Sequence, residues 1–396
     1  MNNFVQLGVV SDILGGYAFS SNEMHSRPGE YQLIKMTNLY QGTLDLNRSP
    51  SYWENIDSKT EKFLLLQDDI LITLTGTVGK RDFGFTVIIN DEKNLLLNQR
   101  VCRIRSNCSK VVPYYLFQYL KTKYFLDQFF DCSIGGTGNQ TNVSLVDLRE
   151  FDILLPPLPE QKSIADLLST WDAAIEKTER LIAAKERRFD GYIQKMVDSG
   201  THLWEHKKTN EIFSEFSKKN CPNEELLSVT QDRGVIPRSM LEGRVMSPDG
   251  TLDTYKLVHK GDFVISLRSF QGGLEYSEYT GILSPAYTVL SPKIKIDPEF
   301  YRHFFKSNIF VQKYLAVSVI GIRDGKQISV PDFMITKLPC PPLNEQIRIS
   351  STLNIMRKEI DLLKQVLTKT KQQKNGLMQK LLTGTWRVKT MAKAYS

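Results

Sequence analysis

The sequence predicts an α+β protein made of two similar globular halves, each followed by a long helix, with the two helices packed as an antiparallel coiled coil about a pseudo-twofold axis. Three observations lead to this fold class. The chain contains an internal repeat, each copy of the repeat opens a segment with coiled-coil spacing, and each half mixes strand-like runs with one helix that begins at a proline.

The internal repeat is the clearest of the three. The segment LPPLPEQKSI at 155–164 returns as LPCPPLNEQIRI at 338–349, and alignment of their Glu-Gln pairs gives an offset of 185 residues. The same offset places Pro113 on Pro298, and no gap is needed from there to the end of the helix. A chain of two similar halves is suited to contact two similar sites at a fixed separation.

Both helices carry a seam of packing residues spaced alternately four and three apart, which is the spacing of a coiled coil. Prolines just upstream prevent helix formation and so fix both helix starts. A helix over 160–197 would be about 57 Å long at ~1.5 Å per residue, long enough to act as a spacer. The short connection from Val197 to Trp204 favours antiparallel over parallel pairing. The seam positions are Ile164, Leu168, Trp171, Ile175 and Ile182 in the first helix and Ile349, Leu353, Met356, Ile360 and Leu367 in the second.

Each globular half is expected to be a small α+β unit. Strands are predicted at 69–72 and 262–265, each followed by a turn that contains glycine, and helices are predicted to begin at Pro113 and Pro298. The predicted boundaries are 1–157 for the first globular half, 158–198 for the central helix, 199–342 for the second half, 343–384 for the C-terminal helix and 385–396 for a tail.

Composition narrows the class of protein. With 41% hydrophobic and 24% charged residues among 396, and no apolar run near the ~20 residues that span a bilayer, no membrane association is expected. The first residues lack the basic start and apolar stretch of a secretory signal, so a cytoplasmic location is expected. Five scattered cysteines without a CxxC pair indicate neither a disulfide framework nor a zinc cluster. His202 and His206 could share a helical face as metal ligands, but no cysteine or acidic signature accompanies them.

The sequence shows no familiar catalytic motif. The segment TGTVGK at 75–80 resembles a phosphate loop, but Leu74 stands where the first glycine is needed and Arg81 where Ser or Thr is needed. GxGxxG, GxSxG, HExxH and NPPY-like motifs are also missing. The chain is therefore expected to be non-catalytic and to bind neither a cofactor nor a metal.

Polar loops supply the candidate contacts to nucleic acid, and a net charge of +7 is consistent with a polyanionic partner. The loops at 135–142 and 321–327 occupy corresponding places but differ in sequence, as two different readings of DNA would require. Asn and Gln side chains suit adenine edges, Arg suits guanine and Lys suits phosphate. Solvated turns are the alternative explanation, and the aromatic cluster at 114–130 is better explained by core packing than by stacking on bases. The candidate DNA-binding residues are Gly76, Thr77, Lys80, Arg81, Arg100, Asn139, Gln140, Asn142, Arg233, Arg268, Arg323, Lys326 and Gln327.

The duplicated LPPLPEQ-type segment before a long helix resembles the specificity (S) subunit of type I restriction-modification enzymes over nearly the whole chain. Supporting matches are the segments DIL at 69–71, GTVGK at 76–80, LNQR at 97–100 and GLMQKLLTG at 376–384. The resemblance implies that the globular halves are target recognition domains, each reading half of a bipartite double-stranded DNA site, and that the helices act as a ruler.

The resemblance also implies partner subunits. It predicts two methyltransferase subunits that use S-adenosylmethionine to modify adenine at N6, and two motor-nuclease subunits that use ATP and Mg²⁺. Because the loops of the two halves differ, the DNA site should be asymmetric. Two other functions remain open at this level: a coiled-coil adaptor whose globular halves bind proteins, and an autonomous modification enzyme, which the missing cofactor motifs disfavour.

Overall fold

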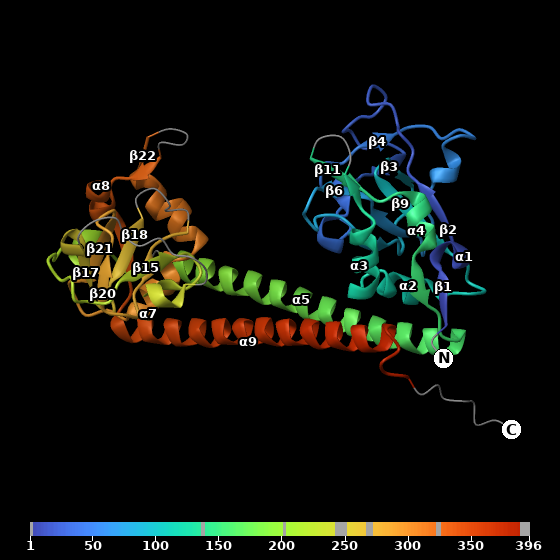
Figure 1. Ribbon diagram of the computed structural model, residues 1–396. Helices are drawn as coiled ribbons and strands as arrows, with labels where there is room; N and C mark the ends of the chain where they lie inside the picture. Colours follow the sequence, from blue (N-terminus) through green and yellow to red (C-terminus); the bar gives the residue numbers. More distant parts are fainter. Residues whose placement is uncertain are drawn as a thin grey trace. The chain divides into compact units, whose positions relative to one another are not determined.

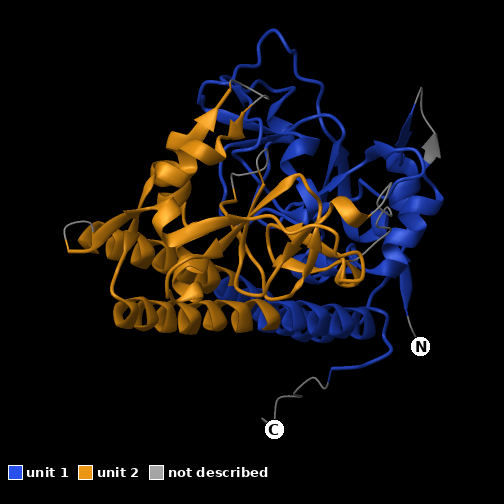
Figure 2. Ribbon diagram, turned by 90° about the vertical axis from the view of Figure 1, so that its left-hand side faces the viewer, with its two compact units in different colours: residues 1–178, 366–396 blue, residues 179–365 orange. Residues whose placement is uncertain are grey.

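The computed structural model describes residues 3–135, 139–200, 203–241, 252–266, 272–321 and 326–388. The chain divides into two compact units, which Figure 2 shows in different colours. Unit 1 contains residues 1–178 and 366–396, and unit 2 contains residues 179–365. Each unit therefore combines one globular half with a stretch of both long helices.

Unit 1 is built around a four-stranded antiparallel sheet in the order β2-β9-β5-β7. Its strands are β2 (Ser11–Gly15), β9 (Val101–Ser106), β5 (Ile70–Thr73) and β7 (Thr86–Ile88). In a two-stranded sheet, β1 (Phe4–Gln6) pairs with β12 (Asp152–Leu154). One three-stranded sheet has the order β4 (Tyr52–Trp53), β3 (Tyr31–Ile34), β8 (Leu95–Leu97). The other has the order β10 (Ile134–Gly135), β11 (Gln140–Asn142), β6 (Thr75–Thr77). Its short helices are α1 (Leu7–Val10), α2 (Pro113–Tyr119), α3 (Lys123–Asp131) and α4 (Leu145–Glu150).

Unit 2 repeats this sheet with the same strand order, β14-β21-β18-β19. Its strands are β14 (Phe213–Phe216), β21 (Tyr287–Pro292), β18 (Phe263–Ser266) and β19 (Glu275–Tyr276). Two-stranded pairs form from β13 (Glu205–Lys208) with β24 (Lys337–Cys340), β15 (Leu227–Thr230) with β16 (Gly234–Pro237), β17 (Lys256–Val258) with β20 (Gly281–Leu283), and β22 (Val319–Ile320) with β23 (Gln327–Ile328). Its short helices are α6 (Thr209–Ile212), α7 (Pro298–Phe305) and α8 (Val330–Ile335).

The 185-residue offset is therefore a structural repeat as well as a sequence repeat. It carries α2 onto α7, α4 onto α8 and β12 onto β24, and the first residue of each element coincides with that of its counterpart. The predicted helix starts at Pro113 and Pro298 are confirmed. The aromatic residues of the 114–130 cluster include several of the largest buried side chains of unit 1, among them Tyr115, Tyr119, Phe125 and Phe129, so core packing explains them.

The predicted strand at 69–72 begins one residue later, and its counterpart in unit 2 does the same. The cause is a repeated turn. The Asp69 carboxylate accepts the backbone N–H of Leu66 at 2.7 Å, and that of Asp262 accepts the N–H of His259 at 2.8 Å. An aspartate that closes its own turn in this way competes with the strand ladder, so the strand starts at the next residue.

The long helices are α5 (Leu158–Gly200) and α9 (Leu343–Leu382). They pair antiparallel in each unit, because the residue numbers of contacting side chains rise along α5 as they fall along α9. In unit 1 Asp172 bonds Lys374 at 2.6 Å, and Glu160 near the start of α5 meets Arg387, which lies beyond the end of α9, at 2.9 Å. In unit 2 Glu186 pairs with Lys364 at 2.7 Å, and further along α5 the Phe189 ring centre lies 4.4 Å from the Arg357 guanidinium, which precedes Lys364 on α9. All ten predicted seam residues are buried or half-buried.

The Glu-Gln pair of the repeat has a structural reason. The side-chain oxygen of Gln161 accepts the N–H of Val112 at 2.9 Å, and its nitrogen donates to the carbonyl of Pro156 at 2.8 Å. Gln346 makes the same two bonds in unit 2, from Asp297 and to Pro341, both at 2.8 Å. Each glutamine is almost completely buried and fastens the first turn of a long helix to the segment before α2 or α7.

No helix among the described residues is both long and apolar enough to cross a membrane.

Candidate nucleic-acid interface

Two loops that the sequence separates by more than sixty residues become neighbouring strands in unit 1. Strand β11 pairs antiparallel with β6, next to which it lies in Figure 1, in a register that sets Gln140 opposite Thr77 and Asn142 opposite Thr75. The Thr75 hydroxyl donates to the side-chain oxygen of Asn142 at 3.1 Å. The glycine turn and the Asn-Gln loop therefore form one surface.

The glycine turn after β6 is held in a defined conformation. The Asp82 carboxylate accepts the backbone N–H of Thr77 at 2.8 Å and its hydroxyl at 2.7 Å, and these bonds lower the pKa of Asp82. A side chain at Gly76 would place its Cβ 2.3 Å from the ring of Phe83, so only glycine fits there. Such a pre-formed turn loses little entropy when it meets a ligand.

A groove of about 370 Å³ lies beside this surface, and its lining includes Gly15–Gly16, the turn at Gln99–Arg100, and β11. Arg100 adopts a left-handed conformation, with φ of 69°, at the start of β9, and its side chain is exposed. Close approach of the first two segments requires Gly16, because a Cβ there would lie 1.9 Å from the carbonyl oxygen of Asn98. The groove thus unites the predicted residues Arg100, Gln140 and Asn142.

Sequence reasoning missed three polar residues of this groove, namely Gln99, Thr75 and the buried Thr141. Gln99 stands next to the predicted residue Arg100 in the LNQR segment, and this adjacency could have identified it. Thr75 is found only through strand pairing with β11, which the sequence does not reveal.

The remaining candidates of unit 1 have different surroundings. Asn139 lies beside the turn, since its carbonyl accepts the N–H of Val78 at 3.2 Å, and Lys80 is exposed. Arg81 instead lies against α3, with its guanidinium 3.3 Å from the Asp127 carboxylate and 4.8 Å from the centre of the Phe130 ring.

In unit 2 the β22–β23 pair is the counterpart of β10–β11. Lys326 and Gln327 are exposed there. Arg233 lies apart from them, in the turn between β15 and β16, and donates to the carbonyl of Met240 at 3.3 Å. Arg268 and Arg323 lie outside the described residues, as does His202.

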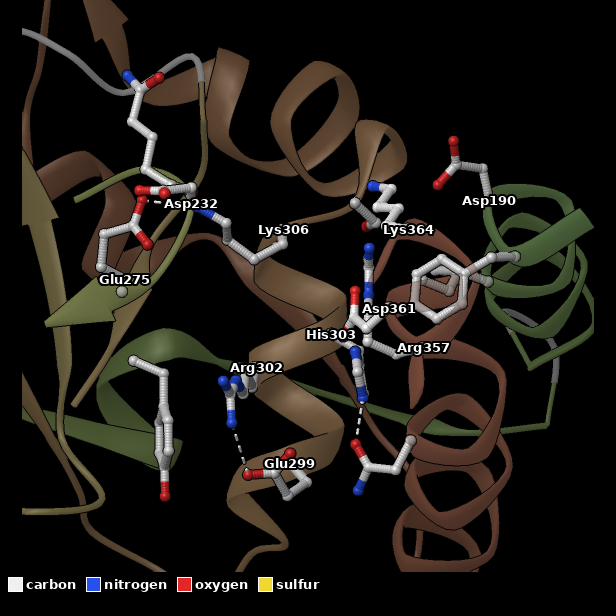
Figure 3. A pocket seen from close by; sticks show the side chains of 17 residues that line it. Asp190, Asp232, Glu275, Glu299, Arg302, His303, Lys306, Arg357, Asp361 and Lys364 are labelled. Atoms are coloured by element: carbon white, nitrogen blue, oxygen red, sulfur yellow. Dashed lines mark hydrogen bonds and ion pairs between the residues drawn. The ribbon is translucent and has the colours of Figure 1, made fainter. Parts of the chain in front are cut away.

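A second cavity, of about 520 Å³, lies in unit 2 between α7 and the two long helices (Figure 3). Two of its basic residues pair with carboxylates: Arg302 lies 3.3 Å from Glu299 and Lys306 lies 2.6 Å from Glu275. His303 bonds the Asn354 side chain at 2.7 Å, and burial lowers the pKa of His303. We assign this cavity to the packing of α7 on the helices, because Arg302 and Lys306 pair with carboxylates and Arg357 lies over the Phe189 ring. Within the described residues, no cluster of His, Cys, Asp and Glu has the makings of a metal site.

Comparison with known proteins identifies the family. The model of the type I restriction modification DNA specificity domain matches residues 2–186 and 202–372. The chain is 27% identical to the putative type I restriction enzyme MjaX specificity subunit of Methanocaldococcus jannaschii, over 91% of this chain and 88% of the relative. It is 23% identical to the type I restriction enzyme EcoBI specificity subunit of Escherichia coli, over 97% and 85% of the two chains.

The fold also matches a solved structure, that of the type I restriction-modification S subunit from M. genitalium. The TM-score is 0.57 at 18% identity, with 96% of both chains covered. Since the family model matches both halves of the repeat, the chain belongs to the type I restriction modification DNA specificity domain family.

Proposed function

We propose that this chain is the specificity subunit of a type I restriction-modification enzyme, and that its two units each read one half of a bipartite DNA site. The observation that supports the proposal is that the same arrangement of strands occurs in both units. Both units have the same sheet order, and the β10–β11 and β22–β23 pairs occupy the same place in each. Family membership and full-length relatives named as specificity subunits support the same conclusion, whereas nothing supports a coiled-coil adaptor.

The two half-sites should differ in sequence. The frame is shared, but NQRV at 98–101 corresponds to SPAY at 284–287, and TLTGTVGK at 73–80 corresponds to SLRSFQGG at 266–273. Because the side chains that face DNA differ while the scaffold does not, the bases contacted by unit 1 and unit 2 should not be the same.

We assign the chemistry to partner subunits. Two methyltransferase subunits with S-adenosylmethionine would modify adenine at N6, and two motor-nuclease subunits with ATP and Mg²⁺ would restrict unmodified DNA. This chain would act without catalysis of its own and without a cofactor, by positioning those subunits on a chosen sequence. The missing nucleotide and methyltransferase motifs support this division of labour.

The test is to co-express the chain with its candidate methyltransferase in a host that lacks adenine methylation, and to map modified adenines across the genome. We expect a gapped two-part motif that disappears when the chain is omitted. The control is the methyltransferase alone, shown to be folded. A folded complex with no motif would contradict the proposal and favour the adaptor function.

A direct binding measurement complements the mapping. DNA affinity of the complex should fall steeply and linearly in a log–log plot against salt, because phosphate contacts release counterions. A duplex with the mapped motif should compete far better than a scrambled duplex of the same length and composition.

A further inference from the structure

We propose that Asn142 and Gln327 are equivalent base-reading residues, and that each contacts an A·T pair in the major groove of its own half-site. The inference rests on the proposed function and deepens it, since it names one base pair in each half-site and the side chain that selects it.

The equivalence of the two residues is fixed by the capped helix that comes directly after each of them. Asn142 stands two residues before Ser144, whose hydroxyl caps α4 by accepting the N–H of Asp147 at 3.1 Å. Gln327 stands two residues before Ser329, whose hydroxyl caps α8 by accepting the N–H of Asp332 at 3.4 Å. Both caps and both amides are related by the 185-residue offset, so the repeat itself places a carboxamide at this position in each unit.

The side chains of both residues point out of their units. The adjacent residues Val143 and Ile328 are buried, with exposed fractions of 0% and 3%. Asn142 and Gln327, one position earlier in the chain, are exposed. Because side chains alternate along a strand, burial of one residue aims its neighbour outward.

In unit 1 the amide is oriented before DNA arrives. The Thr75 hydroxyl donates to the Asn142 oxygen at 3.1 Å, which fixes which edge of the amide carries the N–H₂ group. Its oxygen has a second lone pair for the adenine N6 amino group, while the N–H₂ group suits N7. Orientation by Thr75 reduces the entropy lost on binding.

In unit 2 the amide has an apolar neighbour. Gln327 lies opposite Ile320 in the β22–β23 register, and the Ile320 side chain is 44% exposed. In the major groove an A·T pair offers N6 and N7 of adenine beside the methyl group of thymine. A carboxamide next to an exposed aliphatic side chain complements both features, whereas a G·C pair has no methyl group to match.

The experiment compares the complete complex of wild type, Asn142→Ala and Gln327→Ala by genome-wide mapping of modified adenines. Competition between duplexes that differ at single positions of the mapped motif then measures each preference. We expect Asn142→Ala to lower the preference for A·T at one position of one half-site by about tenfold, and Gln327→Ala to do the same at one position of the other half-site.

Matched controls distinguish a loss of base recognition from a loss of folding. Asn47→Ala and Asn344→Ala remove exposed carboxamides elsewhere in units 1 and 2 and should leave the motif unchanged. The length exchanges Asn142→Gln and Gln327→Asn retain the amide and should keep adenine as the preferred base.

Three results would overturn the inference: an unchanged preference at every position, a uniform weakening over all sequences, or relaxation at a G·C pair. A wild-type complex that gives no gapped motif would overturn the proposed function itself, and this inference with it. The wild-type arm therefore tells the two failures apart.

Discussion

At the scale of single residues, the buried glutamines Gln161 and Gln346 explain why the repeat is visible in the sequence at all. Each satisfies a backbone donor and a backbone acceptor at the point where prolines interrupt regular structure. Buried backbone groups without partners are costly, so no apolar side chain of similar size can replace the amide.

Gln161→Ala should destabilise unit 1 by about 1–3 kcal/mol, because the buried N–H of Val112 and the carbonyl of Pro156 lose their partner. Hydrogen exchange should rise in the first turn of α5 and stay unchanged at 343–349. Gln346→Ala should give the mirror result in unit 2. If hydrogen exchange rose equally at the starts of α5 and α9 in either variant, the effect of each glutamine would not be local to its own helix start.

His303 should make the stability of the chain sensitive to acid. Burial is the main cause that lowers its pKa below the ordinary 6.5, against the hydrogen bond that its ring donates to the Asn354 side-chain oxygen and the charge of Glu299, which raise it. Below pH 6.5 the unfolded chain therefore binds a proton that the folded chain excludes. The free energy of unfolding should fall as the pH drops through 6.5 and level off below the folded pKa.

The matched variant is His303→Gln, because glutamine is the residue at the equivalent position of unit 1, Gln118. Urea unfolding at pH 7.5 and 5.5 should show a smaller loss of stability on acidification than in wild type. Since the other histidines are unchanged, the difference between the two proteins isolates His303. An identical pH dependence would refute the assignment.

The residues of the candidate interface were only partly predictable from the sequence. Asn142 and Arg100 could be chosen because their side chains suit bases and because they lie in loops. Thr75 could not, since its role depends on pairing between β6 and β11. Arg81 shows the opposite case, because charge alone suggested a phosphate contact and the structure packs the side chain on α3.

At the scale of elements, the seam of α5 and α9 was predictable because spacing along a helix is fixed by its geometry. The partners of Lys374, a buried polar residue of α9, could not be predicted from that spacing. Lys374 bonds the Asp172 carboxylate, which also accepts from the Tyr114 hydroxyl at 2.5 Å and from the Gln118 amide at 2.9 Å. The network therefore ties α2 to both long helices in unit 1.

Unit 2 holds different residues at the four equivalent positions, namely Glu299, His303, Arg357 and Phe189. There the Arg357 guanidinium lies 4.4 Å from the centre of the Phe189 ring, and the cavity of Figure 3 opens beside it. The repeat thus preserves the backbone arrangement but not the side chains at these four positions. The polar contacts between the globular half and the long helices therefore differ between the two units.

Lys374→Met should destabilise unit 1 by about 1–3 kcal/mol, because it leaves the Asp172 charge without its cation. The cost stays moderate since 37% of the Asp172 side chain is exposed to solvent. The double variant Asp172→Asn with Lys374→Met should recover much of the loss, and urea unfolding of all four proteins forms the cycle. Simple additivity of the two single effects would contradict a direct coupling.

At the scale of the whole molecule, the sequence predicted the duplication, the two long helices and their antiparallel sense. It did not predict the order of strands, because pairing between distant strands leaves no periodic mark in the sequence. The order β2-β9-β5-β7 and its copy in unit 2 emerge only from the structure. The duplicated order makes the strongest case that both units perform the same kind of recognition.

The ruler function of the helices leads to the last prediction. Both helices pass from one unit to the other, α5 between Thr178 and Glu179 and α9 between Gln365 and Val366. Insertion of one heptad at each of these two places keeps the seam in phase, because the seam repeats every seven residues. Seven residues add about 10.5 Å of helix, which corresponds to ~3 base pairs of DNA.

The gap between the two half-sites should therefore lengthen by about three base pairs, while both half-site sequences stay the same. Genome-wide mapping of modified adenines measures both quantities in one experiment. The control inserts a heptad in α5 alone, which leaves the two helices unequal and should abolish modification without creating a longer gap. A paired insertion that left the gap as it was would show that the helices do not set the spacing. A paired insertion that changed the half-site sequences would show that base reading and spacing depend on the same residues.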